Sequence, residues 1–382
     1  MKPMTGRERI LAAVRHEEGD RVPVSPRVHA WLYGEYGDER LETLLEHLPE
    51  MDPMHCVPSP TPNYLDGFQD DAGDYDLPDV TVEQTRRREG AFTVVERTFH
   101  TPAGDLSDTT RIPPPNGEYG LLPNPVRKRH LLEEPDHLER LPFLFPPVRR
   151  EHPELHRARE LMGDRGVVLA WVHSALDHMA GFARSMSELM IDYYVHRPFF
   201  EELLALCHRR SLEELGAALE AGAEAVFGSW YFNSLSAGWS PAIFREVFLP
   251  QLRDHVALTH RYGALYDYYD DGRLAGTMEM IADAGVDVLE TCTPPPVGDF
   301  DLEHAKGTIG DRTTLKGYVD LLYVVRQGTP ELIDRTVRRA MEAAKRGGGF
   351  IIGSSDSFRD GTPPENIRAY FRACLDYGRY GA

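Results

Sequence analysis

Residues 266–274 read YDYYDDGRL, so that three aspartates and three tyrosines directly follow the apolar start of a strand-like run. A carboxylate buried without a partner costs several kcal/mol to remove from water, so packing alone does not explain this composition. Alternate residues of a strand face the same side, which places Asp267, Tyr269 and Asp271 on one face. We therefore expect this face to belong to a chemical site.

Polar side chains also follow other strand-like runs, where the carboxyl ends of parallel strands would bring them together at the mouth of a small-molecule site. The run SSD at 354–356 makes Asp356 another candidate. The residues expected to bind substrate are Arg27, His29, His173, Trp230, Asn233 and Asp267. Arg27 is suited to grip an anion because a guanidinium binds anions in a bidentate manner. The alternatives are a hydrogen-bonded core histidine for His173 and a side chain that fills the barrel top for Trp230.

The elements that must position these residues alternate regularly after residue 150. Short apolar strands such as VVLAWVHS and GFIIGSS are each preceded by an amphipathic helix that ends near a glycine. This alternation is typical of repeated βα units with a parallel sheet. No phosphate-binding glycine motif follows any strand. The sequence therefore predicts an α/β fold, a single (β/α)8 barrel domain over residues 1–382, with an N-terminal extension and a β-hairpin insertion at 92–112.

Composition excludes several other classes of protein. The 382 residues are 41% apolar and carry a formal net charge of −19, which favours solubility and argues against a nucleic-acid partner or an acidic membrane surface. The four cysteines lie far apart without a CxxC motif, so neither a disulfide framework nor a zinc ribbon is indicated. Residues 1–21 are charged throughout, and no apolar run is long enough to span a membrane. We expect a cytoplasmic enzyme.

Four segments together resemble the uroporphyrinogen decarboxylase superfamily. They are TGRERILAAVRHEEGDRVPV, ADAGVDVLE, IGDRTTLKGYVD and the ending GGGFIIGSSDSFRDGTPPENIRAYFRACLDYGRYG. This superfamily includes the decarboxylase itself and barrel methyltransferases that take methyl groups from corrinoid proteins. The resemblance implies a (β/α)8 barrel with a deep cleft at its C-terminal mouth, and it suggests a homodimer.

The decarboxylase branch resembles proteins with an arginine-rich RQAGR stretch after the first strand. This chain reads SPRVHAWLYGEYG there, which retains Arg27 and adds His29 but has no paired arginines. A porphyrinogen with eight carboxylates would meet one cation within a strongly acidic protein. Coulomb repulsion therefore argues against that substrate.

The thiol-methylating branch resembles proteins that hold zinc with a His-x-Cys pair and a second cysteine. In this chain Tyr269, Asp271 and Asp356 occupy the matching positions, so a zinc site with soft ligands is not expected. One hypothesis is a metal site with oxygen ligands from Asp271, Asp356 and Glu290, which would suit Mg, Mn or a carboxylate-held Zn. The other is that these carboxylates transfer protons or hold a cationic group, because clustered carboxylates have raised pKa values.

The leading functional hypothesis is a methyltransferase or demethylase acting on a small molecule, with methylcobalamin on a corrinoid partner protein or tetrahydrofolate as methyl carrier. Asp271 or Asp356 would position or deprotonate the methyl acceptor, Tyr269 would supply a hydrogen bond, and Arg27 would orient an anionic part of the ligand. The alternatives are a lyase that decarboxylates a small acid held by Arg27, and a catalytically silent ligand-binding barrel.

Overall fold

The computed structural model describes residues 3–64, 75–118 and 120–381. The chain divides into two compact units. The first consists of Met1–Pro58, His152–Val172 and Ala218–Ala382, and the second of Ser59–Glu151 and His173–Ala217. Among the described residues, no helix is long and apolar enough to cross a membrane.

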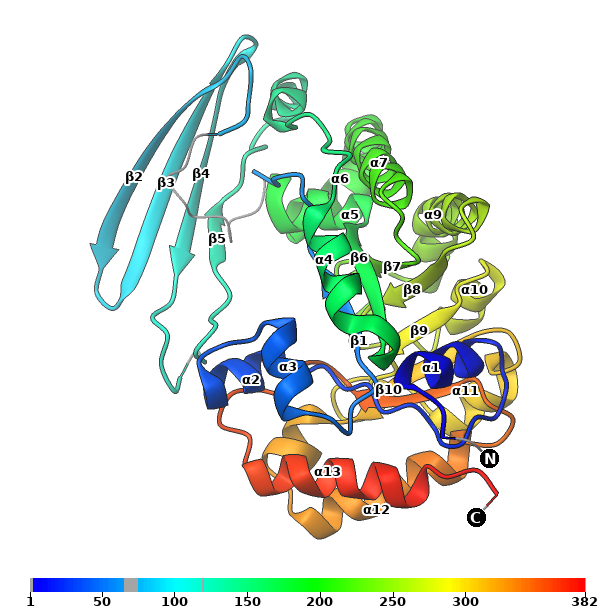
Figure 1. The fold of residues 1–382 in the computed structure, drawn as a ribbon. Helices are drawn as coiled ribbons and strands as arrows, with labels where there is room; N and C mark the ends of the chain where they lie inside the picture. Colours follow the sequence, from blue (N-terminus) through cyan, green and yellow to red (C-terminus); the bar gives the residue numbers. More distant parts are fainter. Residues whose placement is uncertain (1–2, 65–74, 119, 382) are drawn as a thin grey trace. The chain divides into compact units, whose positions relative to one another are not determined.

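The first unit is built around a parallel sheet, which the described residues form from seven strands (Figure 1). Every pair of strands with a defined register runs parallel. In spatial order the strands are β1 (Met54–Val57), β6 (Val167–His173), β7 (Ala225–Ser229), β8 (Leu265–Tyr269), β9 (Val288–Thr291), β10 (Thr314–Val319) and β11 (Phe350–Ser354). From β6 to β11 strand order follows chain order, because each strand is linked to the next by a helical crossover, whereas the chain between β1 and β6 includes the strands of the second unit. The predicted α/β fold with a parallel sheet is confirmed.

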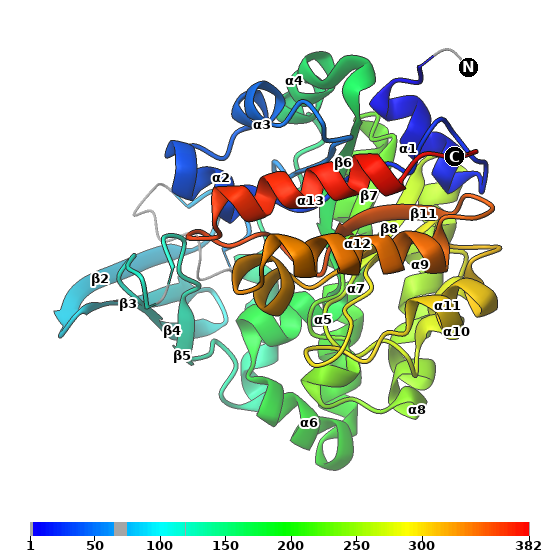
Figure 2. The same ribbon diagram turned by 90° about the horizontal axis from the view of Figure 1, so that it is seen from below.

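Helices form the connections, and each buries one face. Helix α12 begins after the N-cap Thr329, and its buried residues, from Ile333 to Ala344, recur at helical spacing. It lies beside α13 in both views (Figures 1 and 2). The α-helices described in this unit are α1 (Gly6–Val14), α2 (His29–Tyr36), α3 (Leu41–His47), α4 (Pro153–Met162), α8 (Pro241–Ile243), α9 (Leu249–Arg261), α10 (Met278–Asp283), α11 (Leu302–Ile309), α12 (Pro330–Ala344) and α13 (Pro364–Tyr377).

A short segment at 22–25 joins the two edge strands of the sheet. The Ser25 N–H donates to the Ile352 carbonyl of β11 at 2.8 Å, and Val24 forms a parallel bridge with Ile352. On the other side, the Asp52 N–H donates to the Val24 carbonyl at 2.8 Å, and the Met54 N–H of β1 donates to Ser25 Oγ at 3.1 Å. The eighth strand of the predicted barrel is not found in the part of the chain that the structure describes, where seven strands form the sheet and the segment at 22–25 makes a single bridge to β11.

The buried carboxylate of Asp52 holds this segment in place. It accepts hydrogen bonds from Arg9 Nη1 at 3.0 Å, from Arg21 Nη2 at 3.1 Å and from the Val24 N–H at 2.9 Å. Its side chain is only 2% exposed, so its negative charge depends on these partners rather than on water.

We predict that Asp52→Asn lowers the free energy of unfolding by about 3 kcal/mol, because the change removes the shared partner of two largely buried guanidinium groups. Denaturant unfolding of the purified variant measures this. The matched control is Asp38→Asn, which affects an ion pair with the exposed Arg40 and should cost much less, because water solvates the charges of a surface pair. Equal losses in the two variants would contradict the role given to Asp52.

The second unit contains a four-stranded antiparallel sheet in the order β2 (Thr81–Glu89), β3 (Phe92–Thr101), β4 (Gly104–Ile112) and β5 (Val126–Arg129). Strands β3 and β4 form the hairpin predicted at 92–112. The buried carboxylate of Asp108 pairs with Arg97 and Arg127 within this sheet. The unit also contains α5 (Ala175–His178), α6 (Met186–Val195) and most of α7 (Arg197–Glu220).

Candidate active site

A cavity of about 350 Å³ opens at the carboxyl ends of β7 to β11 in the first unit. In a parallel barrel-like sheet this end carries the chemistry, because the loops that follow the strands converge there. The cavity is lined by Ser236, Asp271, Gly272, Thr293, Val297, Asp320, Leu321, Leu322, Ser355, Asp356 and Arg359. Two of the three predicted catalytic residues, Asp271 and Asp356, therefore lie on one cavity.

The third predicted catalytic residue, Tyr269, contacts Asp356. Its hydroxyl donates to Asp356 Oδ1 at 3.2 Å, and Arg359 Nη2 lies 3.3 Å from Asp356 Oδ2. Burial, together with the charges of Asp356 and Asp271, raises the pKa of Tyr269 well above its ordinary value. Tyr269 is therefore a neutral hydrogen-bond donor to Asp356.

The pKa of Asp271 suits a group that donates and accepts protons near neutral pH. Burial and the negative charge of Asp356 raise the pKa of the Asp271 carboxyl to about 6. Both its protonated and its ionised form are thus populated close to neutral pH, which suits general acid–base chemistry.

Arg27 lies beside Tyr269, but its guanidinium is already paired with Glu290. Arg27 Nε donates to Glu290 Oε1 at 2.8 Å, and Nη2 lies 3.3 Å from Glu290 Oε2. The guanidinium carbon lies 4.4 Å from the ring centre of Phe227 and 4.5 Å from that of Tyr269. The role of Arg27 in orienting an anionic ligand stays a prediction.

Glu290 also pairs with Lys316 of β10, whose Nζ lies 2.9 Å from Glu290 Oε1. Burial opposes ionisation, yet Arg27 and Lys316 together lower the pKa of Glu290 to about 2.

The predicted binding residue Asp267 lies close to the same lysine, with Lys316 Nζ 3.9 Å from Asp267 Oδ2. Burial and the nearby charge of Glu290 raise the pKa of Asp267 well above its ordinary value. Asp267 is therefore a buried group within a paired charge network.

These contacts separate the three carboxylates proposed as metal ligands. Asp271 and Asp356 line the cavity, whereas Glu290 is bound by Arg27 and Lys316. Among the described histidines, cysteines, aspartates and glutamates, no group of three is arranged to hold a metal ion. The residues present therefore do not fit a three-carboxylate metal site.

The other predicted binding residues have different surroundings. Burial and the charge of Arg27 lower the pKa of His29 to about 3, so its imidazole is neutral. Trp230 is fully buried, and its Nε1–H donates to the Tyr266 hydroxyl at 2.9 Å, which supports the packing interpretation. Asn233 is buried beside it, with its N–H donating to the Trp230 carbonyl at 3.0 Å. His173 belongs to the second unit, where its Nδ1 lies 3.6 Å from Asp177 Oδ2.

The sequence reasoning missed two residues, Lys316 and Arg359. Lys316 lies within the segment IGDRTTLKGYVD, where a lysine inside a strand is as unusual as an aspartate, because lysine is rarely buried without a partner. Arg359 lies three residues after Asp356 and outside any predicted strand, so no sequence pattern indicated it as a site residue. Asp320 caps the helical turn that follows it, because its Oδ1 accepts from the Leu322 and Tyr323 N–H groups.

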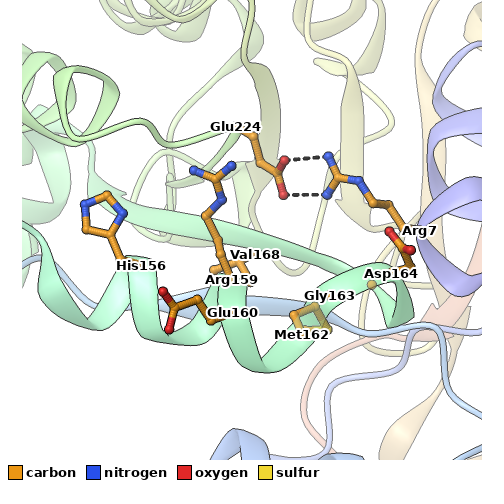
Figure 3. A pocket seen from close by; sticks show the side chains of 10 residues that line it. Arg7, His156, Arg159, Glu160, Met162, Gly163, Asp164, Val168 and Glu224 are labelled. Carbon is orange, nitrogen blue, oxygen red and sulfur yellow. Dashed lines mark hydrogen bonds and ion pairs between the residues drawn. The ribbon is translucent and has the colours of Figure 1, made fainter.

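A second cavity, of about 420 Å³, lies beside the start of β6 and is bordered by Gly163 and Val168 (Figure 3). An ion pair between Arg7 and Glu224 faces it, with both guanidinium Nη atoms donating to the carboxylate at 2.6 and 2.5 Å. Residues at the amino ends of barrel strands serve stability in this fold class, so we assign the chemistry to the first cavity.

Comparison with known proteins agrees with the predicted resemblance. A family model described as Uroporphyrinogen decarboxylase (URO-D) matches residues 110–377, and the chain therefore belongs to this family. A uroporphyrinogen decarboxylase from Methylococcus capsulatus is 25% identical over 266 residues, covering 68% of this chain and 73% of the relative. A methylated-thiol–coenzyme M methyltransferase from Methanosarcina mazei is 27% identical over 137 residues, covering 36% of this chain and 34% of the relative.

A solved structure has a similar fold over nearly the whole chain. It is a methyltransferase from Methanosarcina mazei, with a TM-score of 0.64 and 17% sequence identity, and the match covers 98% of this chain and 99% of that one. At this identity the likeness establishes the fold alone.

The raised pKa of Asp271 predicts an effect on stability. The folded protein holds this proton more tightly than the unfolded chain, in which the pKa is near 3.8, so stability is lost as the pH rises through about 6. Asp271→Asn does not ionise, and it should raise the free energy of unfolding at pH 8 by up to about 3 kcal/mol, with the gain shrinking towards zero at pH 4.

Denaturant unfolding at the two pH values measures this gain. Asp376→Asn, which alters an exposed carboxylate on α13, should show no such gain and serves as the control. An Asp271→Asn variant that is less stable than the wild type at pH 8 would contradict the raised pKa.

Proposed function

We propose that this protein is a methyltransferase or demethylase acting on a small molecule. The observation that carries the proposal is the pair of carboxylates, Asp271 and Asp356, on one cavity at the strand ends, with a carboxyl group that titrates near pH 6. Methyl transfer from a neutral ether or thioether leaves an anionic oxygen or sulfur that takes up a proton, and methyl transfer to a hydroxyl, thiol or protonated amine releases one, so a proton donor or acceptor at that atom assists both directions. The methyltransferase relative adds support, although it matches only about a third of this chain.

The charges of the lining favour a neutral or cationic ligand over a polyanion. Three carboxylates, from Asp271, Asp320 and Asp356, share the lining with one guanidinium, from Arg359. A substrate with many carboxylates would be repelled by this surface. For this reason we favour methyl transfer over porphyrinogen decarboxylation, although several of the relatives are named uroporphyrinogen decarboxylase.

In the proposed reaction Asp271 handles the proton that accompanies the methyl group. When the methyl group leaves its heteroatom, the bonding electron pair stays on that atom, which then takes the proton from the Asp271 carboxyl. In the reverse direction the ionised carboxylate takes the proton of the acceptor. The carrier, a corrinoid protein or tetrahydrofolate, supplies the methyl group or accepts it. Tyr269 orients Asp356 through the hydrogen bond between them.

Product analysis distinguishes the candidate functions. The purified protein is incubated with methylcobalamin or methyltetrahydrofolate and a panel of small methyl acceptors, and separately with carboxyl-labelled small acids. Loss of the methyl group from the carrier supports the proposal, whereas release of labelled CO₂ supports the decarboxylase. Neither product over the full panels would favour the catalytically silent barrel.

We predict that Asp271→Asn lowers kcat for methyl transfer by about 100-fold or more, because it removes a general acid–base group. The loss of activity should occur without loss of folding stability at pH 7. Steady-state kinetics measure it, with Asp376→Asn as the control of matched chemistry at an exposed position. Unchanged turnover in Asp271→Asn would remove this residue from the mechanism.

A further inference from the structure

Three side chains that are neighbours across β8, β9 and β10 form a continuous row. Tyr269 pairs in register with Glu290, and Glu290 pairs with Lys316. Because register partners of adjacent strands point to the same side of a sheet, the three side chains face the same interior. Glu290 and Lys316 are only 2% and 4% exposed, so neither relies on water to balance its charge.

Arg27 connects this row to the cavity. Its backbone is anchored to β11 and the following loop, because its N–H donates to Ser354 Oγ at 3.1 Å and its carbonyl accepts from the Phe358 N–H at 2.9 Å. With the backbone held, the position of the guanidinium depends on its side-chain torsions. The two hydrogen bonds to Glu290 select the arrangement in which the guanidinium lies over the ring of Tyr269.

Lys316 makes this arrangement possible. Its Nζ lies 2.9 Å from Glu290 Oε1, so that this buried carboxylate has a second cation beside Arg27. Without the ammonium group, Glu290 would lose one of its two cationic partners, and a buried carboxylate with less positive charge around it takes up a proton or moves. Either change would weaken the two hydrogen bonds that hold the Arg27 guanidinium over the ring of Tyr269.

We propose that Lys316 and Glu290 are positioning residues for the active site. They hold Arg27 against the ring of Tyr269, and through that ring they keep the hydroxyl directed at Asp356. The link to turnover rests on the proposed function, whereas the effect on Tyr269 does not. A guanidinium over an aromatic ring changes the electronic environment of that ring, which gives the proposal a readout independent of activity.

The experiment uses protein labelled with ¹³Cζ-tyrosine and compares Lys316→Met with the wild type. The Tyr269 signal is assigned by its loss in Tyr269→Phe. We expect this signal to move in Lys316→Met and to return towards its wild-type position in Lys316→Arg, which restores the positive charge. Lys306→Met removes a half-buried lysine of α11 that donates to the Gly348 carbonyl, and it should leave the Tyr269 signal in place.

Kinetics test the link to turnover. Lys316→Met should lower kcat by about 10- to 100-fold, the usual range for residues that orient a reacting group, with little change in KM. In a Tyr269→Phe background the same change should have almost no further effect, because interacting residues are not additive. Independent, multiplying losses would overturn the positioning role.

The outcomes separate the two proposals. A Tyr269 signal that moves in a protein without methyl-transfer activity would support the positioning role and contradict the proposed function. An unmoved signal in folded Lys316→Met would overturn the positioning role whatever the activity. Should Lys316→Met fail to fold, Glu290→Gln, which keeps the shape of the side chain and removes its charge, is read by the same signal with the same two outcomes.

Discussion

The arrangement of the candidate site depends on the requirement that buried charges be paired. Arg27, Glu290 and Lys316 lie inside the parallel sheet, and each would be strongly destabilising alone. They come from the segment after residue 25 and from β9 and β10, so they meet only when these three parts of the chain have reached their places. Asp52 imposes a similar condition at the sheet edges, where it joins Arg9 and Arg21 to the bridging segment at 22–25.

The same pairing brings the candidate catalytic groups together. Strands β8 and β11 are separated by β9 and β10 in the sheet, yet the hydroxyl of Tyr269 reaches Asp356 beyond the end of β11. The sheet must therefore curl so that its interior side chains converge. Arg27 lies in that interior against the ring of Tyr269. Tyr269 therefore connects the buried charges of Arg27, Glu290 and Lys316 to Asp356, which lines the cavity.

Family membership is shown by the comparison, whereas the reaction is proposed from the chemistry of the site. The family match establishes that the chain belongs to the uroporphyrinogen decarboxylase family, and its relatives include proteins named as a decarboxylase and as a methyltransferase. In this chain Tyr269, Asp271 and Asp356 stand where the thiol-methylating branch that it resembles has zinc ligands. The lining of the cavity at the strand ends carries more carboxylates than cations. The proposal of methyl transfer therefore depends on proton handling by carboxylates rather than on a thiolate bound to zinc.

The sequence by itself determined the α/β class, the parallel sheet, the hairpin at 92–112 and the grouping of Tyr269, Asp271 and Asp356. These follow from local periodicity, from the alternation of strand side chains and from the family resemblance. Only the tertiary structure decided that Glu290 pairs with Arg27 and Lys316 instead of joining Asp271 in a metal site, and that a four-residue segment links the sheet edges. The physical reason is that a charge selects its partner by distance in space, and residues as far apart as 27 and 290 have no sequence pattern that records their contact.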